Sequence, residues 1–312
     1  MWGVFVQKCQ LETTMSIKSC SSLSKRAIED VLNLESVCMD HDNLQGSFFL
    51  DPSLNFNHRI KSFFLLYDKS NLISMLSMFI PTEHEAEITA YTLPKFRGKG
   101  FFKSLLAKAL KELGEFNIPE ILFVFESSSV AGKRVVDSFE AGYDHTEYYM
   151  SLDNVSYTSL NEYHLRLLKV EKKDLEKAII TNMKVFSDSY EESENLIINR
   201  FKLKHREQFL AILGEVIIGI VSVNLEGEGA SIFGLGIEPE YRCKGYGKEL
   251  LHLIIDNLLQ RGRSEINIEV NSENAEALKL YKSTGFYTEV AYEYYRLKLI
   301  KEVIEKLSSQ SS

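Results

Sequence analysis

Cysteine is scarce in this chain of 312 residues. The four cysteines are Cys9, Cys20, Cys38 and Cys243, and no two of them stand in a CxxC pair. Four thiols are too few to cross-link a chain of this length, and a structural zinc site would need paired ligands. The sequence therefore predicts a protein of a reducing compartment that holds no metal.

Long hydrophobic runs and an excess of basic residues are also missing. The apolar opening, residues 1–6, is cut by Gln7 and Lys8 before it reaches signal-peptide length, and no later stretch is long enough to span a bilayer. Lys and Arg number 36 against 44 Asp and Glu, so the net charge of -8 offers no basic footprint for nucleic acid. We expect a cytoplasmic protein that binds neither membrane nor nucleic acid.

The composition is that of a globular protein, and the chain repeats itself. Hydrophobic residues make up 45% and charged residues 26%, which allows two domains with separate cores. Residues 94–101 (PKFRGKGF) align with residues 239–246 (PEYRCKGY) at a constant offset of 145 positions. Since a repeat of this kind decides the whole fold, we interpret the chain as two copies of one domain.

The join between the copies falls in the polar stretch 153–159, which has no periodicity and precedes the strand-like residues 164–170. We predict a degenerate first domain over 1–155, a catalytic second domain over 160–300 and a frayed tail over 301–312. A fused tandem can supply within one chain the packing that single-domain relatives obtain by pairing, and the sequence leaves a monomer and a homodimer open.

Periodicity predicts an α+β fold for each copy, with a mixed central β-sheet flanked by helices. In the second copy we expect helices over 173–186, 191–203, 247–260 and 274–284, and strands over 164–170, 209–213, 216–223, 230–237, 266–270 and 292–299. In the first copy we expect helices over 24–34, 100–113 and 133–140, and strands over 63–67, 72–80, 86–92 and 121–125.

The loop over residues 242–247 (RCKGYG) joins a predicted strand to a predicted helix. Glycines let the backbone come close to a ligand, and the first N–H groups of a helix favour an anion such as a pyrophosphate. The side chains of Arg242 and Lys244 could add positive charge there. Glycines before a helix are also common as plain turn residues, so the loop alone leaves both interpretations open. Two other phosphate-binding motifs are excluded. Glu249 follows Lys248 where a P-loop needs Ser or Thr, and the glycines do not complete the G-x-G-x-x-G of a dinucleotide-binding loop.

Two motifs in order make the second half resemble the GNAT superfamily of acyl-CoA-dependent N-acyltransferases. The first is residues 237–247, which matches the family's pyrophosphate loop, and the second is residues 270–286, which contains Asn274, Tyr281 and Gly285-Phe286. The resemblance covers about residues 163–299, and the first half resembles the same family more weakly.

The resemblance implies acetyl-CoA as co-substrate and a role for each matching residue. Backbone amides of 243–248 would hold the pyrophosphate, the strand ending at Ile237 would pair with the pantetheine arm, and Asn274 would bind the cofactor. An amide at the end of that strand would polarise the thioester carbonyl, which is typically worth about 3 kcal/mol. Tyr281 would protonate the departing thiolate. The implied cofactor-binding residues are Ile237, Arg242, Cys243, Lys244, Gly245, Tyr246, Gly247, Lys248 and Asn274.

An amine acceptor also needs a base, because a lysine-like amine at pH 7 has its lone pair free in only about one molecule in a few thousand. Glu238 and Glu269 are candidates by position, and each is alternatively a solvated or cofactor-facing carboxylate. Tyr281 is alternatively a helix tyrosine that packs on the sheet; its place four residues before Gly285 favours the catalytic role.

The first copy departs from both motifs. Phe102 stands where the second copy has Gly247, and Ser138 stands where it has Tyr281. A bulky side chain would narrow a cofactor groove, and a serine cannot replace a phenol as acid. We therefore expect the first copy to shape the structure or the substrate site, and we place the active site in the second.

Three functions remain open from the sequence. The leading one is acetyl transfer from acetyl-CoA to a primary amine of a small molecule by direct attack. The alternatives are a non-catalytic acyl-CoA sensor and a modifier of protein lysines or N-termini. The acceptor pocket is built from variable parts of such folds, so the acceptor is not named.

Overall fold

The computed structural model describes residues 15–46 and 50–299. The predicted tail over 301–312 and the apolar opening over 1–6 lie outside these residues. The chain divides into two compact units, which we call the N-terminal unit (up to Asp144, and again from Tyr292) and the C-terminal unit (His145–Ala291). No helix within 15–46 and 50–299 has both the length and the hydropathy needed to cross a membrane.

The N-terminal unit contains β1 (Met15–Cys20), α1 (Lys25–Asp42), β2 (Phe63–Asp68), β3 (Asn71–Phe79), β4 (Glu85–Thr92), α2 (Phe101–Glu115), β5 (Glu120–Glu126) and α3 (Val130–Phe139). Two short 3-10 helices, η1 (Pro52–Leu54) and η2 (Pro94–Phe96), lie between them. The strands form an antiparallel sheet in chain order, except that β4 and β5 run parallel.

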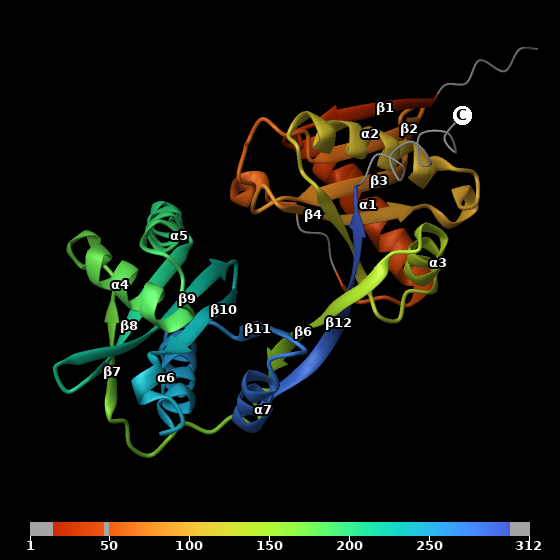
Figure 1. Cartoon of the computed structure of the whole chain (residues 1–312). Helices are drawn as coiled ribbons and strands as arrows, with labels where there is room; N and C mark the ends of the chain where they lie inside the picture. Colours follow the sequence, from red (N-terminus) through yellow and green to blue (C-terminus); the bar gives the residue numbers. More distant parts are fainter. Residues whose placement is uncertain (1–14, 47–49, 300–312) are drawn as a thin grey trace, which may run out of the picture. The chain divides into compact units, whose positions relative to one another are not determined.

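The C-terminal unit repeats this order (Figure 1). It contains β7 (Leu165–Lys169), α4 (Leu175–Phe186), α5 (Tyr190–Lys202), β8 (Arg206–Leu213), β9 (Val216–Glu226), β10 (Gly229–Ile237), α6 (Tyr246–Gln260), β11 (Glu265–Asn271) and α7 (Ala275–Thr284), with η3 (Lys172–Asp174) and η4 (Pro239–Tyr241). Strands β7 to β10 are antiparallel, and β10 runs parallel to β11. The predicted α+β fold with a mixed sheet is confirmed.

Each unit takes its last strand from the other half of the chain. Strand β6 (Gly142–Leu152) follows the first copy in sequence, yet its residues 147–151 pair with β11 of the C-terminal unit. Strand β12 (Phe286–Lys298) follows the second copy, yet its residues 292–298 pair with β5 of the N-terminal unit. The N-terminal unit is therefore made of two stretches of the chain and the C-terminal unit of one, His145–Ala291, whereas the predicted ranges 1–155 and 160–300 follow the repeat.

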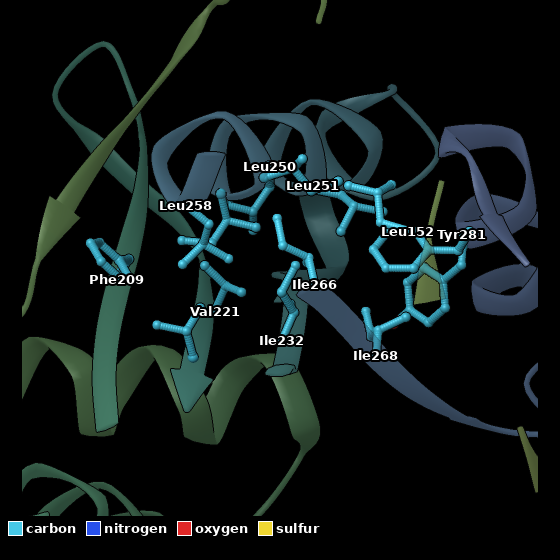
Figure 2. Close-up of a cluster of buried hydrophobic side chains, with 14 of the residues drawn as sticks. Leu152, Phe209, Val221, Ile232, Leu250, Leu251, Leu258, Ile266, Ile268 and Tyr281 are labelled. Carbon is cyan, nitrogen blue, oxygen red and sulfur yellow. The ribbon is translucent and has the colours of Figure 1, made fainter. Parts of the chain in front are cut away.

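The core of the C-terminal unit lies between α6 and the sheet. Buried leucines and isoleucines of α6, including Leu250, Leu251 and Leu258, pack against one face of the strands (Figure 2). The strand side chains that meet them are Phe209, Val221, Ile232, Ile266 and Ile268. Helix α4 covers the opposite face through Ile179 and Val185, which pack with Leu210 and Ile220. Burial of a side chain of this size stabilises the fold by about 1.5–3 kcal/mol, so this three-layer packing fixes the positions of the strand ends.

Candidate functional site

Strands β10 and β11 separate part-way along their length. Their parallel register runs from Gly229↔Glu265 to Ile232↔Ile268 and ends there. Strand β10 then bulges between Phe233 and Gly236, with Gly234 at a φ of 57°, while it stays paired with β9 on its other side. Beyond Ile232 and Ile268 the two strands share no backbone pairs, so the N–H and C=O groups of β10 on this side are available to an extended ligand.

The loop after β10 is held in place by Arg242. Its Nε donates to the carbonyl of Ile237 at 2.9 Å, and its Nη2 donates to the carbonyl of Val185, at the end of α4, at 2.6 Å. The backbone N–H of Glu238 donates to the carbonyl of Ile218 at 2.8 Å. Arg242 thus positions the loop by bonding two backbone carbonyls. The N-terminal unit repeats the first of these bonds, since Arg97 Nε donates to the carbonyl of Thr92 at 2.9 Å.

The backbone of this loop turns twice through the left-handed region, at Cys243 (φ 58°) and at Gly245 (φ 87°), before α6 begins. Residues 242–245 and Lys248 are exposed, and no atom lies within 4 Å of a Cβ built on Gly245. The first N–H groups of α6 have no acceptor within the helix, so they face an open space with the positive end of the helix dipole. Lys244 Nζ donates to the carbonyl of Glu240 at 2.9 Å.

Gly247 lies in the first turn of α6, beside α7. A Cβ built there would be 3.9 Å from Leu280 Cδ2 and 4.0 Å from Ile237 Cγ1, which is ordinary contact. A methyl group fits at this position, and the absence of a larger side chain keeps the space between α6 and α7 open. Together with the loop backbone, this arrangement fits a pyrophosphate and the chain attached to it.

Asn274 and Tyr281 lie at the two ends of α7. Asn274 caps the helix, since its side chain accepts the N–H of Ala277 at 3.1 Å. Tyr281 is 7% exposed, its ring lies 6.2 Å from that of Phe286, and Figure 2 shows it beside Leu152 and Ile268. Burial raises the pKa of Tyr281 to about 12, so the phenol is neutral at physiological pH. Within the described chain no protein group bonds its hydroxyl, which leaves that donor for a ligand.

The two carboxylates proposed as bases differ in their surroundings. Glu238 is buried at the end of β10, and Lys184 Nζ lies 3.4 Å from each of its carboxylate oxygens. Glu269 stands on β11, beyond the last pair with β10; part of the residue is exposed, while its carboxylate is partly shielded by the neighbouring protein. The pKa of Glu269 is raised, first by the surrounding protein, which removes water, and then by the charge of Glu147. The contact with Lys184 was not predictable from sequence, because 54 positions separate the two residues.

In the N-terminal unit, larger or different side chains stand at the positions of Gly247 and Tyr281. Phe102, which replaces Gly247, packs edge-on against Phe139 of α3 with ring centroids 6.3 Å apart. Ser138, which replaces Tyr281, is exposed and donates its hydroxyl to the carbonyl of Val135 at 2.8 Å. The N-terminal unit therefore has an aromatic ring where the C-terminal unit has Gly247, and an exposed serine where it has the buried phenol of Tyr281.

Comparison with known proteins identifies the family. The family model "Acetyltransferase (GNAT) family" matches residues 28–134 and 174–286, together more than two thirds of the chain. Among curated relatives, [Ribosomal protein bS18]-alanine N-acetyltransferase of Escherichia coli K12 is 40% identical over 57 residues, which are 18% of this chain and 38% of that protein. Mycothiol acetyltransferase of Clavibacter michiganensis is 36% identical over 64 residues, 20% of this chain and 21% of that protein. The chain thus matches well under half the length of these relatives.

Solved structures agree on the fold. A GCN5-related N-acetyltransferase from Sphaerobacter thermophilus has a TM-score of 0.75 at 14% identity, covering 91% of this chain and 96% of its own. A tandem GNAT protein from the clavulanic acid biosynthesis pathway has a TM-score of 0.67 at 11% identity, covering 91% and 98%. At such low identity these likenesses show the fold alone. With both halves matched by one family model, the chain belongs to the acetyltransferase (GNAT) family and contains two copies of its domain.

Proposed function

We propose that the C-terminal unit transfers an acetyl group from acetyl-CoA to the primary amine of a small molecule by direct attack. The observation that carries this proposal is that one unit contains three features: the edge of β10 beyond its last pair with β11, the loop over 243–248 at the start of α6, and the buried, neutral phenol of Tyr281. A single extended thioester with a diphosphate can lie along all three.

The chain's own groups have distinct tasks in this reaction. Backbone N–H groups of residues 243–248 bind the diphosphate, and Arg242 keeps them in place through Ile237 and Val185. Acetyl-CoA, when bound, supplies the acetyl group and a thiol leaving group. An N–H at the end of β10 stabilises charge on the carbonyl oxygen, an effect typically worth about 3 kcal/mol for one such donor.

Protons move in two directions. As the amine nitrogen bonds the carbonyl carbon, a carboxylate takes the amine proton, and as the C–S bond breaks, Tyr281 donates to the sulfur. An ordinary thiol has a pKa of about 8.5, well below that of Tyr281, so the phenol acts first as a hydrogen-bond donor to the thiolate. Full transfer requires that the same buried surroundings also raise the pKa of the thiol.

Two carboxylates compete for the role of base. Glu238 adjoins the end of β10 but is paired with Lys184, whereas the raised pKa of Glu269 suits proton abstraction nearer neutral pH. Glu238→Gln and Glu269→Gln separate the two. The base is the residue whose loss removes the acidic limb of the pH profile of kcat/KM while binding of acetyl-CoA is retained.

The test uses the complete chain, because each sheet needs a strand from the other half. Calorimetry with acetyl-CoA should show binding, and mass spectrometry of a panel of amines should show acetylated products that Tyr281→Phe reduces. Absence of acetyl-CoA binding would refute the assignment. Binding without product for any amine would support a non-catalytic sensor instead.

A protein acceptor is the second candidate. The segment similar to [Ribosomal protein bS18]-alanine N-acetyltransferase favours it, although that segment covers only 38% of the relative. Peptides with free N-terminal alanine, assayed beside free amines, decide between the two. Turnover of the peptides alone would assign the activity to protein N-termini.

A further inference from the structure

One backbone N–H at the end of β10 points to the side on which the strand has no partner. The N–H of Glu238 donates to the carbonyl of Ile218 on β9 at 2.8 Å. Successive residues of an antiparallel ladder direct these groups to opposite sides, so the N–H and C=O of Ile237 point away from β9. The bond from Arg242 Nε to the carbonyl of Ile237, at 2.9 Å, agrees with this direction. Since β11 pairs with β10 only as far as Ile232, the N–H of Ile237 faces a side without a neighbouring strand.

The residue before this N–H packs against the end of α4. Gly236 has no side chain, and a Cβ built on it would overlap Cγ1 of Val185 and lie 3.3 Å from Cζ of Phe186. Val185 is 3% exposed and belongs to the core under α4. Its side chain therefore lies directly on the backbone of Gly236, closer than a residue with a Cβ would allow.

The same turn of α4 contacts the groups on the other side of this N–H. Lys184 Nζ lies 3.4 Å from each carboxylate oxygen of Glu238. The carbonyl of Val185 accepts a hydrogen bond from Arg242 Nη2 at 2.6 Å, and the Nε of the same guanidinium bonds the carbonyl of Ile237. The peptide groups around Ile237 are thus held by three contacts, and each of them involves the last turn of α4.

The N-terminal unit has the same ladder with a different residue beside it. The N–H of Leu93 donates to the carbonyl of Ile73 at 2.9 Å, which repeats the bond of Glu238 at an offset of 145 positions. At the same offset, Tyr91 stands where the C-terminal unit has Gly236. Because tyrosine has a Cβ, a helix side chain cannot lie on its backbone in this way. The close contact between helix and strand end therefore depends on a glycine of the unit to which we assign the activity.

We propose that the last turn of α4 positions the N–H of Ile237 on the carbonyl oxygen of the thioester, with Val185 and Gly236 as positioning residues. This inference rests on the proposed function and identifies both the amide donor and the element that fixes it. Such a donor stabilises the developing charge only at about 2.7–3.1 Å from the oxygen, and a misplacement of about 1 Å can lower a rate about 100-fold. The end of a strand with one neighbour needs a second contact to hold this distance, and the buried turn of α4 supplies it.

The deciding measurement is the infrared stretch of the thioester carbonyl, which needs no acceptor. Acetyl-CoA with an isotopic label at this carbonyl carbon is bound to the complete chain. The stretch should lie at a lower frequency than in the free thioester, because a hydrogen bond weakens the C=O bond. Gly236→Ala should lose most of this shift and still bind acetyl-CoA, because its methyl group meets Val185 and displaces the amide. An unshifted carbonyl in wild type, or an equal shift in Gly236→Ala, would overturn the inference.

Compensation separates positioning from a loss of folding. Val185→Ala removes the methyl group that Gly236→Ala meets, so the double variant should regain the carbonyl shift. With an amine that is turned over, Gly236→Ala should lower kcat about 10- to 100-fold with the KM for acetyl-CoA within about threefold, and the double variant should recover about tenfold. A double variant that regains thermal stability without the carbonyl shift would contradict the proposal, since a purely structural contact predicts that result.

A variant at an exposed position tests the same turn without a change in the core. Lys184→Met removes the contact with Glu238, next to the amide, and should reduce the carbonyl shift in part. The matched control is Lys177→Met, because Lys177 lies on the same helix, is similarly exposed and pairs with Asp174 at 3.3 Å. This control should keep the full shift. An equal shift in wild type and Lys184→Met would count against the turn as the positioning element.

Failure of this inference is distinguishable from failure of the proposed function. Calorimetry measures binding of acetyl-CoA and mass spectrometry measures acetylated product, and neither depends on the carbonyl shift. Binding and product formation with an unshifted carbonyl would refute the positioning role alone. Absence of acetyl-CoA binding would refute the proposed function and, with it, the inference that rests on it.

Discussion

Both units contain the same arginine-bearing loop, but part of the arginine side chain has different partners in each unit. In each, an arginine donates Nε to the carbonyl at the end of the preceding strand at 2.9 Å: Arg97 to Thr92, and Arg242 to Ile237. The rest of the guanidinium binds Asp42 through two hydrogen bonds in the N-terminal unit and the carbonyl of Val185 in the C-terminal unit. The shared arginine therefore belongs to the framework of the loop, and its presence does not mark a working site.

The first difference between the units at this loop is a single side chain. Gly247 leaves the space between α6 and α7 open, whereas Phe102 packs on Phe139 between α2 and α3. The parallel pairing also stops part-way in the N-terminal unit, since β4 and β5 pair only from Glu85↔Glu120 to Ile88↔Phe123, although β4 stays in regular register with β3 where β10 bulges against β9. The end of this strand pairing is thus common to both units, and the units differ in the side chain at the start of the following helix.

The largest effect is expected when the C-terminal unit is given the phenylalanine that the N-terminal unit has at this position. Gly247→Phe should weaken acetyl-CoA binding by about 100-fold or more in calorimetry, because the ring would fill the space beside Leu280. Gly247→Ala is the control and should bind nearly as wild type, since a Cβ makes only ordinary contact there. Phe102→Gly should leave this binding unchanged. Tight binding by Gly247→Phe would show that the ligand lies elsewhere.

Tyr281→Phe tests the second difference between the units. We expect kcat to fall by about 10- to 100-fold, within the usual range for loss of a general acid, with acetyl-CoA affinity unchanged. Because burial raises the pKa of Tyr281 to about 12, its proton is kept as pH rises to 10 and lost only above that. The wild-type rate should therefore show no fall due to this phenol up to pH 10. A variant with full activity at every pH would remove Tyr281 from the mechanism.

A third and smaller difference is that Arg97 forms an ion pair with Asp42, whereas Arg242 binds a backbone carbonyl instead. Asp42→Asn should lower the free energy of unfolding by about 1–3 kcal/mol, because a partly buried guanidinium loses a charged partner, and acetyl-CoA binding should stay unchanged. The hydrogen bonds of Arg97 lower the pKa of Asp42 below its ordinary value. The stabilisation is therefore present above that ordinary value, near 4, and is lost as pH falls through the lower pKa of the folded state. Denaturant titrations at pH 7 and pH 3 should show a larger deficit of the variant at pH 7 than at pH 3.

Reactivity of Cys243 should give the smallest effect. This thiol is exposed on the loop, whereas Cys38 is buried and its pKa is raised by burial. Acetyl-CoA should slow alkylation of Cys243 severalfold and leave the rate for Cys38 unchanged, as read by peptide mass spectrometry. The first copy has Gly98 at the corresponding position and offers no such thiol. Equal rates with and without acetyl-CoA would count against ligand contact with the loop.

Periodic segments were predictable, and polar or exposed ones were not. Helices α4 to α7 lie within a few residues of their predicted ranges, because their apolar positions repeat at helical spacing and pack into the two cores on either face of the sheet. Helix α1 was predicted over 24–34 and continues to Asp42, where buried Cys38 extends its apolar face. Strand β1 was not predicted, because Met15–Cys20 is mostly exposed and lacks a clear alternation. The site was predicted only where residues are close in sequence, and the partners of Glu238 and Arg242 lie more than 50 positions away.

The sequence by itself determined that one domain is repeated, that each copy is α+β, and that one copy kept the glycine and the tyrosine of the family's motifs. These features depend on local periodicity and on spacing within a few turns of chain. Only the tertiary structure decided that β6, which follows the first copy in sequence, pairs with β11, that β12, which follows the second, pairs with β5, and that Arg200 and Arg206 meet over Phe233. Strand pairing and charge clustering bring together residues distant in sequence, and local spacing does not record such contacts.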